Sequence, residues 1–581
     1  MHDKRTVVLS RGARVPRHFP DTCCPLPSRA AATAVSLSRP GRVEPSEPAA
    51  ARRRLRFFLV RSRRHHRHQA LVSSSSSGIS SGSSPAALHH PVLRARSSRA
   101  TGGYDSPDYE PSLPVSEKSN PLTRDIDRAS ANCIVQMLQA CDAQMFQEET
   151  GATYQRLLSE QVVETLMEVA QRVELILKDP QDSLVVLSGC GTSGRMAFLI
   201  TVCEGKKRVL FIGISCGLSA PFVAGQLDFC LRHSDVYTPV LVGFNPAHQA
   251  RDEPMPGSTL TFRSMVQRMQ ALAKSHKAFL LNPAVGPEAI SGSSRMKGGS
   301  ATKILLEVVL SAAHAAAFAN APITYKGVLQ RMKAYEQTLD ITYAQSEGMT
   351  ALLEAAGQSL RRGGRVCYLG WGSLAVLGLV DASECDPTFG AGERSVMYAD
   401  NTVQNHTQGP GFCIAHEDFL RLVLPSLTDK DFVLLLYTHS DDVSEVVKLA
   451  RRWELSTKLV LNAVSTGAHV LKGKIYHNHM IDVQATNSKL YCRATRLLQK
   501  LSGCPQSQCE EALLKAIYQV DKLTVDITSS DINTHTRAAR NRTKVVPLAL
   551  VCLLTGCSLV EARSYLEQQP IVRDAVEACL S

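Results

Sequence analysis

From about residue 117 onward, apolar positions follow helical and strand periods in alternation along the chain. Apolar side chains recur at helical spacing over residues 132–148 and 160–178, which predicts two amphipathic helices. Short apolar runs predict strands over residues 183–189, 207–215, 236–245 and 277–284. Strands that alternate with helices in this way predict an α/β fold with a doubly wound, flavodoxin-like parallel sheet.

The pattern then repeats, which predicts a second copy of the same α/β domain. The stretch from Gly364 to Glu384 restates the strand, glycine-rich turn and helix that begin at Leu184. The segment "TKILLEVVLSAAH" at 302–314 shares six of its thirteen residues with "TKLVLNAVSTGAH" at 457–469. The two matches have different offsets, so the copies have gained or lost residues relative to each other.

These patterns divide the chain into four parts. Residues 1–116 form a tail, 117–320 a first α/β domain and 321–455 a second. Residues 456–581 show helical patterns and no convincing strand, which predicts a small all-α domain.

Net charge separates the tail from the rest of the chain. The sequence carries a formal charge of +12, and residues 1–116 hold 19 basic against 7 acidic side chains. The remaining residues therefore carry no net charge, and the excess of positive charge lies in the tail. Abundant arginine and serine without an apolar period predict disorder there.

Three interpretations of the tail remain open. It has the composition of an organelle transit peptide, which is rich in Arg and Ser and poor in acids. The arginines at 61–67 are also compatible with a nuclear signal or a nucleic-acid patch. A solvated extension without a fold is the third interpretation, and we expect no nucleic-acid binding.

Cysteine usage and hydropathy limit the class of protein. Seventeen cysteines are scattered without metal-ligand spacing, which favours a reducing compartment and mostly buried thiols. The longest apolar helical stretch, around 304–321, is interrupted by Glu307 and His314 and is expected in the core. We therefore expect no membrane association.

Three Gly/Ser loops follow predicted strands or open predicted helices, and this arrangement suits a phosphate group. They span Gly189–Gly194, Ser215–Ser219 and Ser291–Ser300. Backbone N–H groups at a helix N-terminus and nearby hydroxyls attract phosphate, and glycine lets the backbone approach a ligand closely. The spacing fits neither a dinucleotide fingerprint nor a Walker A loop. Ordinary helix capping by Ser or Thr is the alternative interpretation.

These loops carry a resemblance to a known family. "SGCGTSGRMAF", "GISCGLSAPFVAGQ" and "SGSSRMKGGSATK" resemble a sugar isomerase (SIS) domain. With "STGAHVLKGKIYHNHM" and "QATNSKL" they resemble the glucokinase regulatory protein family over roughly residues 115–581. That family has two SIS domains followed by a helical lid. The related N-acetylmuramic acid 6-phosphate etherases resemble a single SIS domain that dimerises to form its site.

The resemblance implies ligands and residues. The family's ligands are fructose 6-phosphate and fructose 1-phosphate, and its protein partner is glucokinase. It implies no cofactor, no metal, a monomer, and a location in cytoplasm and nucleus. The residues implied to bind sugar phosphate are Gly191, Thr192 and Ser193 in the first loop, Ser215, Cys216, Gly217 and Ser219 in the second, Ser293 and Ser294 in the third, Glu384 facing the sugar, and Lys474 from the lid.

The sequence departs from the family pattern at two junctions. After Cys203 the family carries several dozen residues, including a carboxylate of the sugar site, that this chain lacks. After Trp453 it lacks a stretch whose aromatic patch is associated with glucokinase binding. A splicing variant or a faulty gene structure is compatible with both gaps and with the tail.

A missing carboxylate favours binding over catalysis. Etherase chemistry needs an acid and a base, and the resemblance supplies only Glu384. We therefore predict a non-catalytic regulator, with a sugar-phosphate lyase or isomerase as the alternative. His477 and His479 form an H-x-H pair, but we expect a helix there, on which they share no face. His314 and His469 recur between the copies and are expected to be capping or core residues.

Overall fold

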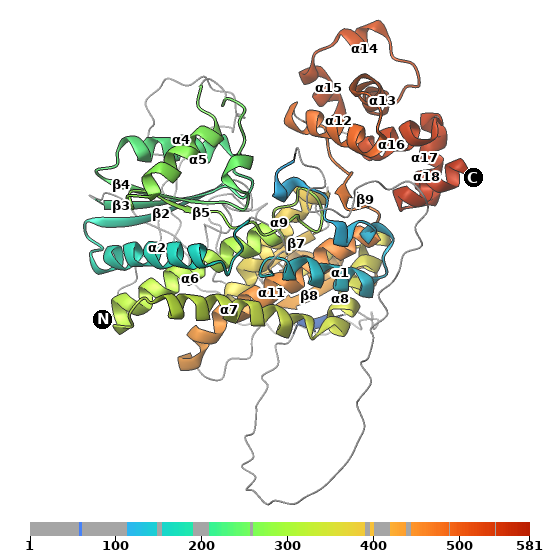
Figure 1. The fold of residues 1–581 in the computed structure, drawn as a ribbon. Coiled ribbons are helices and arrows are strands. Elements are labelled where there is room, and N and C mark those ends of the chain that lie inside the picture. The colour runs from blue at the N-terminus through green and yellow to red at the C-terminus, as the bar shows by residue number, and fades with distance from the viewer. Residues whose placement is uncertain are drawn as a thin grey trace, which may run out of the picture.

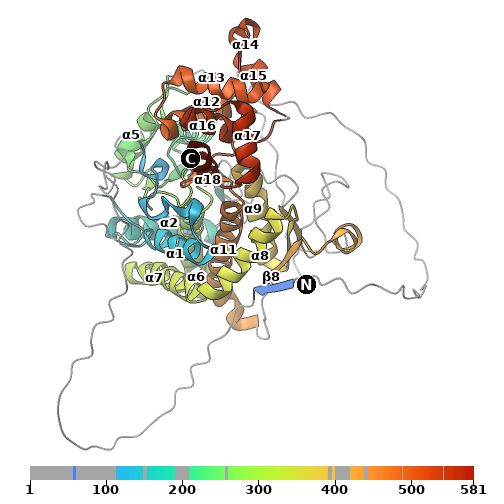
Figure 2. The same cartoon turned by 90° about the vertical axis from the view of Figure 1, so that its right-hand side faces the viewer.

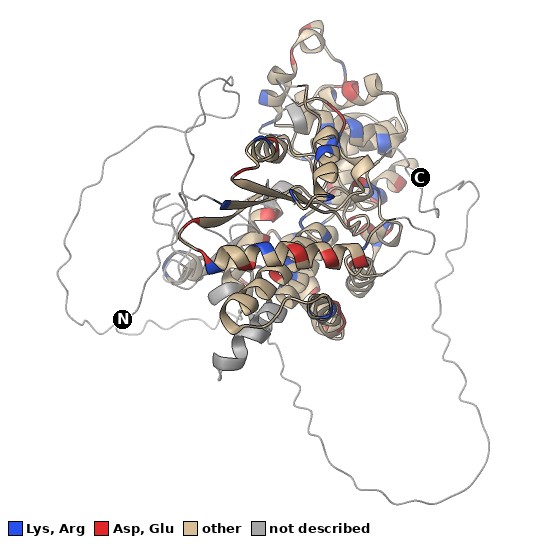
Figure 3. Ribbon diagram, turned by 60° about the vertical axis from the view of Figure 1, so that its left-hand side comes forward, with Lys and Arg blue, Asp and Glu red and all other residues tan. Residues whose placement is uncertain are grey.

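The computed structural model describes residues 57–60, 113–147, 154–189, 208–255, 259–389, 395–399, 419–436, 443–486, 488–540 and 542–581. These residues form two α/β units that lie side by side, with a helical lid above the second unit (Figure 1). A quarter-turn shows the lid helices together at the top of the molecule (Figure 2). Acidic and basic side chains are interspersed on the described helices (Figure 3), in keeping with the charge balance outside the tail.

The first sheet contains four parallel strands in the order β2-β3-β4-β5. They are β2 (Ser183–Gly189), β3 (Arg208–Ile214), β4 (Tyr237–Val242) and β5 (Phe279–Leu281). The predicted strands are confirmed at these four places. Because the strands are parallel, their carboxyl ends meet at one edge, where ligands of such sheets bind.

Helices cover both faces of the first sheet because its strand residues alternate in direction. Leu210 and Ile212 of β3 point into a core with α2 (Glu160–Lys178) and α6 (Lys297–Ala319). Phe211, between them, points into a second core on the opposite face. The helices of that second core are α4 (Pro221–Arg232) and α5 (Phe262–Ala273).

The second sheet is also parallel, in the order β1-β8-β6-β7. Its strands are β1 (Phe57–Val60), β6 (Val366–Gly370), β7 (Ser395–Ala399) and β8 (Phe432–Leu436). Its core is shared with α8 (Ser346–Arg361), α9 (Gly372–Phe389) and α11 (Val443–Leu471). The short helical turns η7 (Phe419–Val423) and η8 (Leu424–Ser426) lie beside it. Within the basic tail, β1 is a strand, contrary to the expectation of disorder at those four residues.

Helices of the amino-terminal segment join the two units. Three short turns precede α1 (Ala131–Ala143), namely η1 (Val115–Glu117), η2 (Pro121–Thr123) and η3 (Ile126–Arg128). Helix α1 packs on α8, on α11 and on α7 (Tyr325–Tyr343). The short turn η4 (Ala247–Gln249) follows β4 and contacts α5.

The lid is helical but begins with a strand pair. A two-residue hairpin, β9 (Ile475–Tyr476) and β10 (His479–Met480), precedes the helices. The helices are α12 (Ser488–Ser502), α13 (Gln506–Tyr518), α14 (Val525–Ser529), α15 (Ile532–Ala539), α16 (Val545–Thr555), α17 (Leu559–Gln568) and α18 (Val572–Leu580).

Two predictions about this region are wrong. The hairpin replaces the helix expected at His477 and His479, because His477 has a positive φ of 52° and the chain reverses there. The predicted domain boundary at residue 456 falls inside α11, which buries Leu461 and Val464 in the second α/β core. Residues 456–471 therefore belong with the second α/β unit.

Helix α6 is a core helix, as predicted. By length and composition α6 could cross a membrane, and so could α16 and α17 if the bent pair formed one span. However, 61% of the most apolar stretch of α6 is buried inside the protein, where the helix packs against α2 and α11. Burial of this kind is typical of the central helix of an α/β core.

Candidate functional site

The second Gly/Ser loop leaves β3 at the carboxyl edge of the first sheet and folds back on its own hydroxyl. The Oγ of Ser215 accepts hydrogen bonds from the backbone N–H groups of Ser219 (3.1 Å) and Ala220 (3.2 Å). Leu218 has a φ of +50°, so the chain makes a tight turn before α4. Ser215 is buried and therefore shapes the loop from inside.

The third loop precedes α6, and its helix end is capped by a carboxylate. Both oxygens of Glu288 accept 2.9 Å hydrogen bonds, one from the N–H of Lys297 and one from the N–H of Gly298. Burial raises the pKa of Glu288, although these N–H groups oppose the shift. Ser293 and Ser294 take part here through their backbone: the Ser293 N–H donates to the Ile290 carbonyl, and the Ser294 carbonyl accepts from the Gly299 N–H.

Gly298 is the point at which the second and third loops meet. A methyl group placed on its Cα would lie 3.4 Å from the Sγ of Cys216 and 3.3 Å from Glu288 Oε1. The Cβ of Ser294 would lie at 3.5 Å. The structure therefore brings together two of the loops that the sequence singled out, at one edge of the sheet.

The amino-terminal segment closes one side of these loops. The side chain of Asn245, just after β4, accepts from the Ser116 N–H and donates to the Ser116 Oγ, both at 2.9 Å. It also donates to the carbonyl of Gly217. The Oγ of Ser291, in the third loop, donates to the carbonyl of Glu117 at 3.4 Å. Ser116 and Asn245 were not among the predicted site residues, because only the folded chain brings them to the loop.

The lid hairpin holds the other side of the third loop. The N–H of Ser291 donates to the carbonyl of Asn478 at 2.8 Å. Asn478 is fully buried, and its side chain bonds to Ser119 and to the carbonyl of Asn120. The third loop is therefore fixed jointly by the lid and the amino-terminal segment.

Glu384 lies in a separate buried cluster that adjoins the third loop. It lines a cavity of about 20 Å³, enough for a single water molecule, with Arg295, Asp381, Lys458 and Asn462. The amide nitrogen of Asn462 has no hydrogen-bond partner among the described residues. A water molecule in this cavity would satisfy it.

Residues of the second unit anchor the third loop in this cluster. Arg295 pairs with Asp381 at 2.8 Å and donates to the hydroxyls of Ser465 (3.1 Å) and Thr466 (2.5 Å). The Nζ of Lys458 donates to the carbonyls of Arg295 (2.9 Å) and Met296 (3.3 Å). Burial lowers the pKa of Lys458 to about 8.

Lys474 pairs with a carboxylate of the lid in the structure. It follows α11, and its Nζ forms an ion pair with Asp482, within the first residues of the lid. The first loop lies outside the described residues beyond Gly189, and with it the predicted ligands Gly191, Thr192 and Ser193. These assignments stay predictions.

The histidine expectations have mixed outcomes. His469 is a core residue as expected, with Nδ1 bonded to the Ser465 carbonyl and its ring stacked 4.4 Å from that of Phe389. Burial lowers its pKa to about 3, so it stays neutral. His314 is exposed and contacts Phe318, so neither the core nor the capping expectation holds for it.

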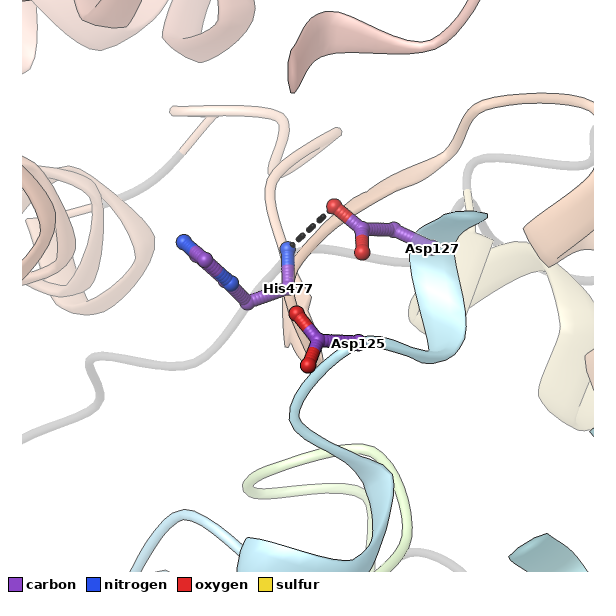
Figure 4. Close-up of side chains that lie close together, drawn as sticks. All are labelled: Asp125, Asp127 and His477. Atoms are coloured by element: carbon purple, nitrogen blue, oxygen red, sulfur yellow. Dashed lines mark hydrogen bonds between the residues drawn. The ribbon is translucent and has the colours of Figure 1, made fainter. Parts of the chain in front are cut away.

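One group in the described residues has the composition of a metal site. Asp125, Asp127 and His477 offer ligand atoms within 4.8 Å of one another (Figure 4). The Nη1 of Arg573 lies 2.9 Å from an oxygen of each carboxylate and 3.1 Å from Nδ1 of His477. A guanidinium already supplies the positive charge there, so the cluster is an ion-pair junction between η3 and α18.

Comparison with known proteins connects this geometry to a family. Three family models match. They are the N-terminal SIS domain of glucokinase regulatory protein at 168–203 and 199–231, the second SIS domain at 343–454, and the C-terminal lid domain at 477–576. The glucokinase regulatory protein of Xenopus laevis is 41% identical, over 83% of this chain and 95% of that protein. The human protein is 39% identical, over 83% and 94%.

The chain belongs to the glucokinase regulatory protein family. As a member of this family it is a regulator and not an enzyme. The N-acetylmuramic acid 6-phosphate etherase of Histophilus somni is a more distant relative, 29% identical over 32% of this chain. The predicted family, fold and non-catalytic role are thereby confirmed.

The comparisons also show that this chain lacks internal residues that its relatives in the family have. The alignment to the Xenopus protein runs over 590 positions, more than the whole chain, yet it includes only 83% of the chain. The relative therefore has residues where this chain has none. The first-domain match divides at residues 199–203, where the first gap was predicted.

Proposed function

We propose that this chain binds phosphorylated ketohexoses, fructose 6-phosphate and fructose 1-phosphate, at the carboxyl edge of the first sheet. The observation that carries the proposal is the meeting of the second and third Gly/Ser loops at Gly298. Residues 215–219 precede α4 there and residues 291–296 precede α6, so two helix dipoles point toward one edge, where Ser215 and Glu288 already accept hydrogen bonds from the first N–H groups.

We further propose that sugar-phosphate binding controls an interaction with glucokinase, including its retention in the nucleus. The third loop supports such coupling, because it contacts the lid through Asn478 and the second unit through Arg295. A ligand that changes the third loop would alter the packing of both. Linkage of this kind requires that each ligand favour one arrangement of the parts.

Two titrations test the proposal. Calorimetry of the full chain with each fructose phosphate should give saturable binding to one site. Glucokinase activity, titrated with the chain at fixed fructose 6-phosphate, should fall, and fructose 1-phosphate should reverse the fall. Absence of binding to either sugar phosphate would contradict the proposed ligand, and product formed from N-acetylmuramic acid 6-phosphate would contradict the non-catalytic role.

A further inference from the structure

A cavity in the lid carries an excess of positively charged side chains. It has a volume of about 350 Å³ and lies where α16 meets α13 and α17 (Figure 1). Arg542, Lys544 and Arg563 line this cavity, and Glu567 is the one carboxylate among its described lining residues. Three positive charges and one negative charge leave the lining with a net charge of +2. The fold thus gathers like charges, which repel one another unless an anion lies among them.

The two arginines of this cavity have guanidinium groups that are free to bind a ligand. Within the described part of the chain, neither Arg542 nor Arg563 has an ion-pair or hydrogen-bond partner for its side chain. Both residues are exposed, so a small molecule can reach them. Arg573, also in the lid, differs from them because it pairs with Asp125 and Asp127.

Lys544 is a cation that the fold holds in place. Its Nζ donates to the carbonyl of Leu566, in the last turn of α17, at 3.2 Å. Its backbone has a φ of 56°, in the left-handed region that costs free energy for a residue other than glycine. It also directly precedes α16, where a positive charge is unfavourable to the helix. The structure therefore keeps a charge at this cavity against two local preferences.

We propose that this lid cavity binds a phosphate monoester, at a site separate from the loops of the first sheet. A phosphate monoester carries a charge of nearly −2 at neutral pH, which matches the net charge of the lining. Each guanidinium can donate two parallel hydrogen bonds to phosphate oxygens, and an ammonium adds a point charge. The hydroxyl of Thr543, which also lines the cavity, would supply a further donor.

The size of the cavity limits the ligand to a small molecule. Its volume of about 350 Å³ is at the low end of the range for small-molecule sites, about 300–1,000 Å³. A phosphate group with a short organic part would fill it. The cavity is formed by lid residues alone, so the proposal does not depend on sugar-phosphate binding at the first sheet.

Hydrogen exchange of the full chain with methyl phosphate, the simplest phosphate monoester, tests the location. The titration is carried out at constant ionic strength, so that general salt effects do not change. We expect saturable protection of residues 543–548, with exchange slowed by about threefold or more. Protection that is absent there, or confined to residues 215–219 and 291–299, would overturn the proposal.

Variants of the arginines test the chemistry, with affinity measured by calorimetry and folding checked by thermal unfolding. Replacing both Arg542→Gln and Arg563→Gln should weaken methyl phosphate binding in the lid at least about tenfold, because charge-assisted hydrogen bonds are lost. Arg537→Gln is the matched control, since Arg537 is an exposed lid arginine that does not line the cavity. It should leave both the affinity and the protection of residues 543–548 unchanged.

A conservative variant separates recognition by the guanidinium from simple attraction to positive charge. Arg563→Lys keeps the charge but loses the planar pair of donors, so it should weaken binding by about threefold or more. Wild-type affinity in the double glutamine variant would overturn the site. Equal weakening by the double variant and by Arg537→Gln would also overturn it, because general attraction to a basic surface would then explain the binding.

Discussion

The same sequence motif has different partners in the two α/β units. In the first copy, Lys303 forms an ion pair with Glu307 on its own helix, and Tyr335 donates to that carboxylate at 2.7 Å. In the second copy, Asn462 replaces the glutamate, and Lys458 instead donates to the carbonyls of residues 295 and 296, in the first unit's third loop. Lys303 therefore pairs within its own unit, whereas Lys458 bonds to the other unit.

This difference indicates that the second unit supports the first unit's candidate site. Arg295 reaches from the third loop to Asp381 of α9 and to Ser465 of α11. The contacts that Arg295 and Lys458 make in this cluster therefore cross the boundary between the units. The second copy of the domain has thus lost the lysine–glutamate ion pair of the first copy, and its lysine instead supports a loop of the other domain.

The largest expected effect is on stability, at the centre of this boundary. Arg295→Ala should lower the free energy of unfolding by about 3–5 kcal/mol, because it leaves Asp381 buried without its cation. Chemical denaturation measures the change. Arg268→Ala, which removes an exposed pair with Asp228, should cost at most about 1 kcal/mol and is the control. Equal losses in the two variants would contradict a buried anchor at Arg295.

The next effect is on the ligand. Ser193→Glu should weaken fructose phosphate binding at least about a hundredfold, since a carboxylate in this predicted phosphate-binding loop would repel and block the phosphate. Calorimetry of the wild-type chain and the variant measures it, and thermal unfolding checks that the variant is folded. Unchanged affinity in a folded variant would remove the first loop from the site.

The pKa of Lys458 predicts a pH dependence. Burial lowers this pKa from 10.5 to about 8, so between these values the unfolded chain binds more protons and stability rises with pH. Relative to Lys458→Met, the wild-type free energy of unfolding should increase by about 2–3 kcal/mol from pH 7 to pH 10.5. All other groups cancel in this difference. A difference that is constant over the range would show that the lysine is not buried as a cation.

A smaller effect concerns the kinase. Aromatic anchors at interfaces commonly contribute about 2 kcal/mol or more to binding. This chain is predicted to lack such an aromatic patch after Trp453. It should therefore inhibit glucokinase at least about tenfold more weakly than a version in which both family segments are restored. Equal inhibition by the two chains would place the contact surface elsewhere.

The smallest effect distinguishes the two equivalent lysines. Lys458→Met should weaken fructose 6-phosphate binding by about threefold to tenfold, because the third loop loses its support from the second unit. Lys303→Met should leave the affinity unchanged, because that amine pairs within α6. If both variants bind like the wild type, the second unit does not support the site.

The sequence predicted the strands and the second and third loops because both are local features. Apolar runs define β2 to β5, and glycine and serine mark the turns that follow or precede the helices. Contacts between distant segments were not predictable. Asn245 holds Ser116, which lies 129 positions away in the sequence. The hairpin at residues 475–480 was missed because two-residue strands carry no period.

The arrangement as a whole predicts that only the first unit binds the sugar phosphate, with the second as its support. Hydrogen exchange of the full chain with and without fructose 1-phosphate tests this directly. We expect protection at residues 215–219 and 291–299, and none at residues 371–375, the equivalent turn of the second copy. Protection of residues 371–375 in place of the first-unit loops would contradict the account.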